Sequence, residues 1–264
     1  MAGQLGETRA RPVALVTGGS RGLGLAAAYA LLDDGADLAI VGRDPRRLRA
    51  ARDGLQHHAG RPVLALAADL GRPGAARKLA ERALRSLGRV DTVVAAAGDV
   101  PVGSLASLDE AAWRYAFAGK LFGHVALLQA LAPQMRARGR GLIIAISGLA
   151  GIEPSPESLA AGAVNAALVN VMKGLARDLG PAGVRVVAIS PGPFLTDRLR
   201  TIARRQGRRT SDAAIARSFA ADVPLGRVGE PSELGALVRY LHSPGAAFLH
   251  GTTLILDGGK TRSA

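Results

Sequence analysis

The strongest constraint on the fold is the way short apolar runs alternate with longer alanine-rich segments along the chain. The short runs are apolar throughout, without the regular polar positions of a half-exposed strand, which is typical of strands buried on both faces of a parallel sheet. Seven runs have this composition: 12–17, 36–42, 62–68, 90–97, 141–147, 184–190 and 252–257. Segments with helical periodicity lie between or beside them: 22–33, 45–57, 73–87, 108–138, 157–179 and 231–241.

This alternation predicts the α/β class. Because strand–helix–strand crossovers are right-handed, we expect a single doubly wound, Rossmann-type domain, a seven-stranded parallel sheet with helices on both faces. The 264 residues fit one such domain, with flexible ends at 1–11 and 260–264. The connection from about 191 to 224 reads as irregular, and because long connections in compact domains are often lids, we predict a substrate lid there.

Composition excludes several kinds of site. The chain has no cysteine, which excludes disulfides, thiolate metal sites and cysteine nucleophiles. No cluster of other residues has metal-ligand spacing, so no metal is predicted. The polar start lacks the apolar core of a signal peptide, and no apolar run approaches the ~20 residues that span a bilayer. We therefore expect a cytoplasmic protein without membrane association.

The formal charge of +13 does not by itself predict a nucleic-acid partner. Of 34 basic residues only four are lysine, and an arginine-rich, alanine-rich composition is more typical of codon bias than of a nucleic-acid surface. The basic residues are also spread along the chain without the interleaved aromatics of a single-strand binder. No nucleic acid is predicted, although a net positive field attracts anions, including a phosphorylated cofactor.

A glycine-rich turn, TGGSRGLG, follows the first strand at 17–24 and opens a predicted helix. Gly18 lets the backbone turn sharply, Gly22 lets it approach a pyrophosphate, and Gly24 allows close packing of helix on strand. A bound phosphate would then face a helix N-terminus. A turn of this kind between a buried strand and a helix predicts dinucleotide binding.

The end of the second strand bears on which dinucleotide binds. A site selective for NAD places a carboxylate there for the ribose hydroxyls, whereas this chain has Gly42 followed by Arg43, with Arg21 in the glycine-rich turn. Two guanidiniums without a facing carboxylate suit a 2′-phosphate and favour NADP over NAD. Asp44 is close, but because proline follows it we expect it to cap the next helix.

Taken together, these motifs make the sequence resemble the short-chain dehydrogenase/reductase family over nearly its whole length. The turn matches the TGxxxGxG motif of that family, AADL matches its adenine-side aspartate, and AAAG at 95–98 lies at its NNAG motif with both asparagines replaced. SPGPFLTD at 190–197 is similar to its PG…T segment, and LILDGG is similar to its last strand.

The resemblance implies NADP(H) as cofactor, with Asp69 at the adenine amino group and Thr196 at the nicotinamide carboxamide. Pro191 and Gly192 would shape the nicotinamide pocket. The full set of cofactor-binding residues that it implies is Gly18, Ser20, Arg21, Gly22, Leu23, Gly24, Arg43, Asp69, Leu70, Ala97, Gly98, Pro191, Gly192 and Thr196.

The four catalytic positions of the family all differ here. In the family a tyrosine exchanges a proton with the substrate oxygen, a lysine lowers its pKa, a serine fixes the substrate, and an asparagine supports a water chain. From the flanking residues, these positions are Ala161 for tyrosine, Asn165 for lysine, Gly148 for serine and Lys120 for asparagine. The divergent set predicts that the usual mechanism is absent.

Lysine and asparagine have exchanged places, which would keep one ammonium and one amide near the nicotinamide. We predict that Lys120 is the principal polar group of the pocket, either as an acid after partial desolvation or as a cation that holds an oxyanion or carboxylate. A branch of the family is similar in its lysine–asparagine arrangement but has a tyrosine near Ser158. This chain departs from that branch too, so no proton donor carries over from it.

The remaining catalytic candidates have simpler alternatives. Asn165 is either a pocket amide or a helix-packing residue, and Ser147 is either a hydrogen-bond partner of Lys120 or a buried strand end. Ser158 is either a pocket hydroxyl or a solvated residue in the first turn of a helix. His124 is interpreted as packed rather than as a base. The three tyrosines, Tyr29, Tyr115 and Tyr240, are poorly placed to serve as a substitute acid.

The favoured function is an NADP(H)-dependent oxidoreductase that acts on a carbonyl or alcohol with this atypical active site. The alternative is a non-redox enzyme (cyclase, dehydratase or isomerase) or a dinucleotide-binding protein without turnover, because fold alone does not settle function. The substrate would be a small molecule, and the arginines of the predicted lid suggest an anionic one: Arg198, Arg200, Arg204, Arg205, Arg208 and Arg209. By resemblance, the helices at 108–138 and 157–179 would form a homodimer face, and the last strand would contribute to a homotetramer.

Overall fold

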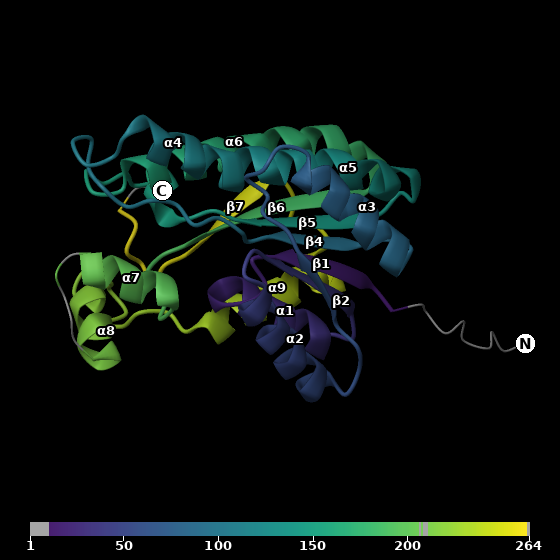
Figure 1. The fold of residues 1–264 in the computed structure, drawn as a ribbon, viewed down its shortest axis with the longest axis horizontal. Helices are drawn as coiled ribbons and strands as arrows, with labels where there is room; N and C mark the ends of the chain where they lie inside the picture. The colour runs from purple at the N-terminus through teal and green to yellow at the C-terminus, as the bar shows by residue number, and fades with distance from the viewer. Residues whose placement is uncertain (1–10, 206, 208–210, 263–264) are drawn as a thin grey trace, which may run out of the picture.

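The computed structural model describes residues 11–205, 207 and 211–262. Across that part of the chain, seven strands form one sheet in the order β3-β2-β1-β4-β5-β6-β7, and every neighbouring pair is parallel (Figure 1). The strands are β1 Val13–Thr17, β2 Asp37–Gly42, β3 Leu64–Ala67, β4 Thr92–Ala95, β5 Gly141–Ile146, β6 Val184–Pro191 and β7 Thr252–Leu256. The predicted Rossmann-type α/β class is confirmed.

Helices cover both faces of the sheet (Figure 1). Those above it in the view are α3 Ala75–Leu87, α4 Glu110–Phe117, α5 Gly123–Ala137 and α6 Leu159–Leu179. Those below it are α1 Gly22–Asp33, α2 Pro45–Ala59 and α9 Pro231–His242. Each face buries its own cluster of Val, Leu, Ile and Ala side chains, because the strands present apolar residues to both layers.

The order of the strands creates a crevice beside β1. From β1 the chain first adds β2 and β3 on one side, and then β4 to β7 on the other. Loops that leave β1 and β4 therefore diverge to opposite sides, and in such sheets ligands bind at this switch point, beyond the carboxyl ends of the strands. The turns after β1, β2, β4, β5 and β6 all begin at this edge of the sheet, where the carboxyl ends of the strands lie.

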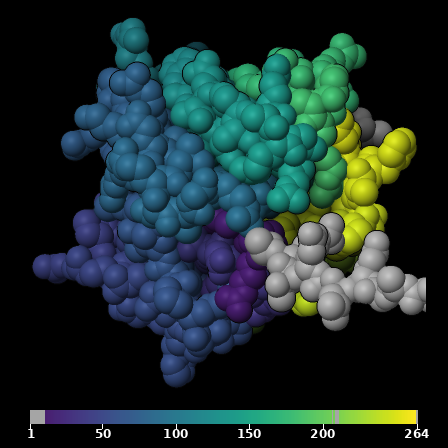
Figure 2. Space-filling view, turned by 90° about the vertical axis from the view of Figure 1, so that its right-hand side faces the viewer, coloured from purple at the N-terminus to yellow at the C-terminus, as the bar shows by residue number. Residues whose placement is uncertain are grey.

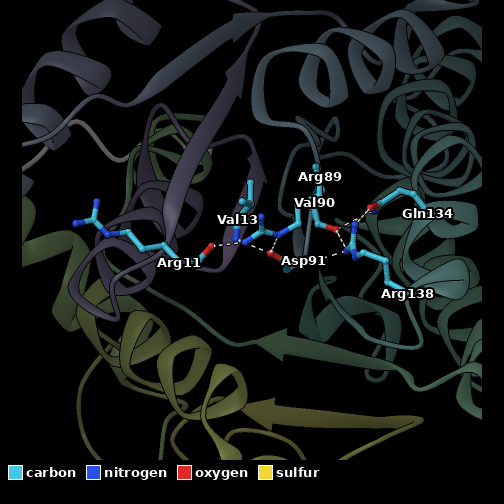
Figure 3. A network of polar contacts seen from close by, with 7 residues as sticks. All are labelled: Arg11, Val13, Arg89, Val90, Asp91, Gln134 and Arg138. Atoms are coloured by element: carbon cyan, nitrogen blue, oxygen red, sulfur yellow. Dashed lines mark hydrogen bonds and ion pairs between the residues drawn. The ribbon is translucent and has the colours of Figure 1, made fainter. Parts of the chain in front are cut away.

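The opposite edge, where the strands begin, is held by Asp91 (Figure 3). Its carboxylate accepts hydrogen bonds from the backbone N–H of Val13 at 2.8 Å, from Arg89 Nε at 2.9 Å and from Arg138 at 3.1 Å. Figure 2 views the molecule from this side and shows the purple N-terminal part of the chain among blue and teal segments that come later in the sequence. Asp91 thus joins β1, β4 and the end of α5.

The connection after β6 is helical, which corrects the prediction of an irregular segment at 191–224. It contains α7 Asp197–Arg205 and α8 Asp212–Ala220, which lie together beyond the carboxyl ends of the strands (Figure 1). Leu199, Ala203 and Ile215 pack into a small apolar cluster of their own, and tertiary packing of this kind stabilises short helices. The role of a lid remains a prediction; Arg208 and Arg209, like 1–10 and 263–264 of the predicted flexible ends, lie outside the described residues.

Two other helical expectations change. The predicted helix at 108–138 is interrupted between α4 and α5 by a π-helical turn, Ala118–Phe122, labelled η1. Also, contrary to the expectation that no apolar run is long enough, the segment Leu159–Ala182 has the length and composition of a membrane-spanning helix. This segment contains α6, which packs against β6 and lines the core with residues such as Val164 and Leu168. Its apolar character is explained by that burial.

We predict that Asp91→Asn lowers the free energy of unfolding by about 2–4 kcal/mol, because the buried Val13 N–H and two arginines lose a charged acceptor. Urea unfolding monitored by circular dichroism measures this change. Asp178→Asn is the matched control, since the Asp178 carboxylate pairs with Arg136 at the surface, where ion pairs contribute little. Equal effects of the two substitutions would contradict a structural role for Asp91.

Candidate active site at the carboxyl edge of the sheet

The glycine-rich turn has the geometry that a pyrophosphate requires. Gly18 has φ 68° and Gly22 has φ 55°, both in the left-handed region that favours glycine. A Cβ on Gly24 would lie 2.4 Å from the carbonyl oxygen of Gly18, so the close packing of α1 on this turn also needs glycine. Within the described structure, Arg21 at the N-cap forms no side-chain cap and the first turn of α1 has no acidic residue. The helix N-terminus can therefore accept a phosphate.

On the adenosine side, the structure separates Asp44 from the site. The Asp44 carboxylate accepts from the backbone N–H groups of Arg46 at 2.8 Å and Arg47 at 3.3 Å, so it caps α2 as expected. The Asp69 carboxylate accepts from the Gly71 N–H at 3.1 Å at the end of β3. Leu70 beside it is buried.

Arg43 is not free of carboxylates, which corrects one premise of the cofactor prediction. Its guanidinium lies 3.6 Å from Asp99 and donates a hydrogen bond to the hydroxyl of Tyr115. These contacts place Tyr115 on the adenosine side of the cleft rather than beside Lys120. The sequence argument missed Asp99, which directly follows the AAAG motif; that position beyond the end of β4 was the available signal.

His124 connects the glycine-rich turn to the π-helical turn. A carbonyl oxygen can only accept, so the ring Nδ1 donates to the Lys120 carbonyl at 2.8 Å, and Nε2 must accept from the Thr17 hydroxyl at 2.9 Å. The same hydroxyl accepts from the backbone N–H groups of Ala96 and Ala97. Burial lowers the pKa of His124 to about 4, so the ring is neutral near pH 7. The prediction of a packed histidine is confirmed.

Lys120 lies inside the protein, in the middle of η1, with 8% of its surface exposed. Its ammonium donates to the Ser147 carbonyl at 2.8 Å, and its methylene groups pack over Gly98. Gly98 has φ 142°, and a Cβ there would lie 2.8 Å from Cδ of Lys120. A π-helical turn often marks a functional site, and here it directs the lysine between the ends of β4 and β5.

Burial, and to a smaller extent the positive charge of Arg198, together lower the pKa of Lys120 to about 7. The side chain can therefore be either an ammonium or an amine at neutral pH. Of the two causes, desolvation is the larger, because burial removes the water that would stabilise the charged amine.

Asn165 lies beside Gly148, just after the end of β5. It is 5% exposed, and its Oδ1 is buried without a hydrogen-bond partner in the described structure. A Cβ on Gly148 would lie 2.7 Å from Asn165 Nδ2, so the asparagine occupies space that a serine at 148 would need. Lys120 and Asn165 thus both lie against the Ser147–Gly148 segment, without a hydrogen bond between them among the described contacts.

The two serines behave differently. The Ser147 hydroxyl lies 2.6 Å from the Ser190 hydroxyl and donates to the Ile189 carbonyl at 3.1 Å, so the alternative of a buried strand end is supported. Lys120 uses the Ser147 carbonyl instead. Ser158 lies at the N-cap of α6 with its hydroxyl 3.0 Å from that of Ser155, so its described contacts do not join it to the lysine.

The segment after β6 lies between β7 and the glycine-rich turn. The Gly192 N–H donates to the Leu256 carbonyl at 3.0 Å, which ties the turn after Pro191 to β7. Thr196 is nearly buried, and its methyl group lies 3.6 Å from the position of a Cβ on Gly22. The PG…T segment and the glycine-rich turn therefore meet, as a site for one dinucleotide requires.

We predict that Lys120→Met raises the free energy of unfolding at pH 6 by about 1–4 kcal/mol, because it removes a buried charge. Between pH 7 and 10.5 the unfolded wild type binds more protons at Lys120 than the native state, so its stability should rise with pH over this range, by up to about 5 kcal/mol. The variant should lose this part of the pH dependence.

Urea unfolding at pH 6 and pH 9 measures both effects. Lys78→Met, at an exposed position of α3, is the control and should change stability by less than about 0.5 kcal/mol. A Lys120→Met variant that is less stable than wild type at pH 6 would show that the amine is not desolvated.

Comparisons with known proteins agree with the dinucleotide-type geometry of the glycine-rich turn and the sheet. Residues 18–261 match the family model described as enoyl-(acyl carrier protein) reductase. An uncharacterized oxidoreductase of Mycobacterium tuberculosis is 36% identical over 250 residues, which cover 94% of this chain and 92% of that protein. L-rhamnose 1-dehydrogenase of Azotobacter vinelandii is 32% identical, with 93% and 94% of the two chains covered.

Solved structures lead to the same family. L-sorbose reductase from Gluconobacter frateurii, complexed with NADPH and L-sorbose, has a TM-score of 0.90 at 28% identity and covers 96% of this chain and 98% of its own. An NADPH-bound short chain oxidoreductase from Pseudomonas aeruginosa, described as containing an atypical catalytic center, has a TM-score of 0.87 at 32% identity with the same coverage. The chain is therefore an oxidoreductase-type member of the short-chain dehydrogenase/reductase family.

Proposed function

We propose that this protein is an NADPH-dependent reductase of a carbonyl compound, or the corresponding alcohol dehydrogenase, in which Lys120 exchanges the proton. The observation that carries the proposal is the buried amine of Lys120 beyond the carboxyl ends of β4 and β5, held by the Ser147 carbonyl at 2.8 Å. The cofactor supplies or accepts the hydride when bound. The turn at Gly18–Gly24 fits its pyrophosphate, as the left-handed glycines and the uncapped start of α1 indicate.

In the reductive direction, the Lys120 ammonium donates one N–H to the carbonyl oxygen of the substrate. As hydride reaches the carbon, the oxygen gains negative charge and takes the proton, which leaves a neutral amine that regains a proton from solvent. A pKa of about 7 suits this exchange near neutral pH. The unpartnered Oδ1 of Asn165 is an acceptor for a hydroxyl group or water in the same pocket.

Arg43 supports NADP as the cofactor. Gly42 presents no carboxylate at the end of β2, and the nearby acid Asp44 is used as a helix cap. The Arg43 guanidinium lies exposed beside Tyr115, where it can pair with a 2′-phosphate. Two of the solved relatives described above are NADPH complexes, which agrees with this preference.

A non-redox reaction on the same fold is the second candidate. The observation that favours it is Ala161, which is 7% exposed and brings no hydroxyl to the position of the family's tyrosine. A lysine of near-neutral pKa can serve as acid or base in proton transfers without hydride. Substrate turnover coupled to NADPH oxidation separates the two candidates.

We predict that NADPH binds at least tenfold more tightly than NADH, since Arg43 adds a charge-assisted contact to the 2′-phosphate. Arg43→Ala should lower the affinity for NADPH by about 10- to 100-fold and change the affinity for NADH by less than twofold. Fluorescence titration of the nicotinamide measures both affinities, with Arg49→Ala, an exposed arginine of α2, as the control. Failure of both dinucleotides to bind would exclude the redox proposal.

We predict that Lys120→Ala keeps the affinity for NADPH within threefold but lowers kcat at least 100-fold, with ketones screened as substrates against NADPH oxidation. In wild type, the pH profile of kcat should show an inflection near 7. Lys120→Arg is the informative second variant, because it keeps the charge but cannot release a proton. Unchanged turnover in either variant would remove Lys120 from proton transfer.

A further inference from the structure

The mouth of the cleft holds more positive than negative charge. Arg198, in the first turn of α7, lies 3.3 Å from Asp99, the same carboxylate that pairs with Arg43 at 3.6 Å. In the described part of the chain, Asp99 is the carboxylate that contacts Arg198, and two guanidiniums share it. Arg21 and Arg205 are close enough that their charges act against that of Arg198.

Arg198 also lies close enough to Lys120 for the two charges to interact. Its charge acts on the amine, and the residue before Asp99 is Gly98, whose backbone packs against the lysine side chain. Two residues before Arg198, Thr196 contacts the glycine-rich turn. The backbone of Arg198 is therefore fixed by the start of α7, and its guanidinium is fixed by the ion pair with Asp99.

The guanidinium is partly desolvated but not closed off. Its side chain is 37% exposed, and burial lowers its pKa ahead of any charge effect. Its one described hydrogen bond leads from one terminal nitrogen to Asp99, which leaves other N–H donors of the planar fork available. A partly desolvated guanidinium with free donors is well suited to bind a second carboxylate in bidentate geometry.

We propose that Arg198 binds a carboxylate of the substrate while Lys120 contacts its carbonyl oxygen, which makes the substrate an oxo acid or, in reverse, a hydroxy acid. Asp99 is then a positioning residue that holds the guanidinium over the pocket. This inference rests on the proposed function, because it names the substrate class of the same site. Under this inference, α7 carries the residue that selects the substrate.

The test uses carboxylates that hydride cannot reduce. Oxamate and malonamate mimic a 2-oxo and a 3-oxo acid, and oxamide and malonamide are their uncharged counterparts. Each is titrated by calorimetry into the full chain loaded with NADPH. Wild type should bind at least one of the two carboxylates, and its uncharged counterpart at least tenfold more weakly.

Arg198→Gln should lower the affinity for the carboxylate at least tenfold and change the affinity for its uncharged counterpart by less than twofold. Arg217→Gln is the matched control, since it removes the same charge from an exposed position of the neighbouring helix α8 and should change the affinity less than twofold. Arg198→Lys keeps the charge but not the planar guanidinium, and its affinity for the carboxylate should be at least threefold lower than that of wild type. If Arg198→Gln does not fold, the comparison of Arg198→Lys with wild type decides the question.

The outcomes separate the two proposals. If wild type does not bind NADPH, the proposed function is wrong and this inference fails with it. The inference is wrong, and the cofactor proposal stands, if NADPH binds but neither carboxylate binds, or if Arg198→Gln binds the carboxylate as wild type does. It is also wrong if Arg217→Gln weakens carboxylate binding as much as Arg198→Gln does. A loss in Arg198→Gln alone, confined to charged probes, supports the inference.

Discussion

The site depends on the burial of one ammonium group. Lys120 is held against the Ser147 carbonyl, where little water reaches it, and its charge costs folding free energy that other packing must offset. Natural proteins keep such groups where the chemistry uses them, because the desolvation that destabilises the charged form is also what brings the pKa to about 7. The same burial therefore lowers stability and, in the proposed mechanism, lets the amine exchange a proton near neutral pH.

Glycines determine where the polar side chains of the site can lie. Lys120 occupies the space over Gly98, and Asn165 occupies the space beside Gly148. A larger residue at either glycine would displace its partner, so each pair must be changed together. With asparagine at 165, glycine at 148 avoids a contact of 2.7 Å. His124 then fixes the turn that carries Lys120 to the turn that would carry a phosphate.

Much of the fold could be predicted from local pattern because the five inner strands of the sheet are almost entirely buried. Valine and isoleucine runs are unambiguous when no polar residue interrupts them, and the ranges of all seven strands overlap those predicted. Prediction failed where the backbone departs from regular geometry or where packing is local. The π-helical turn at Ala118–Phe122 has the periodicity of an ordinary helix in sequence, and α7 and α8 form through their own small core.

By itself, the sequence determined the class of fold, the order of its elements and the turn at Thr17–Gly24, because hydrophobic periodicity and glycine spacing are properties of neighbouring residues. The tertiary structure decided which distant groups meet. Asp99, which follows β4, pairs with Arg43 after β2 and with Arg198 in α7, and Thr17 forms a hydrogen bond with a histidine 107 positions away. Such contacts follow from the order of strands across the sheet, and pairing between residues far apart in sequence leaves no local pattern to read.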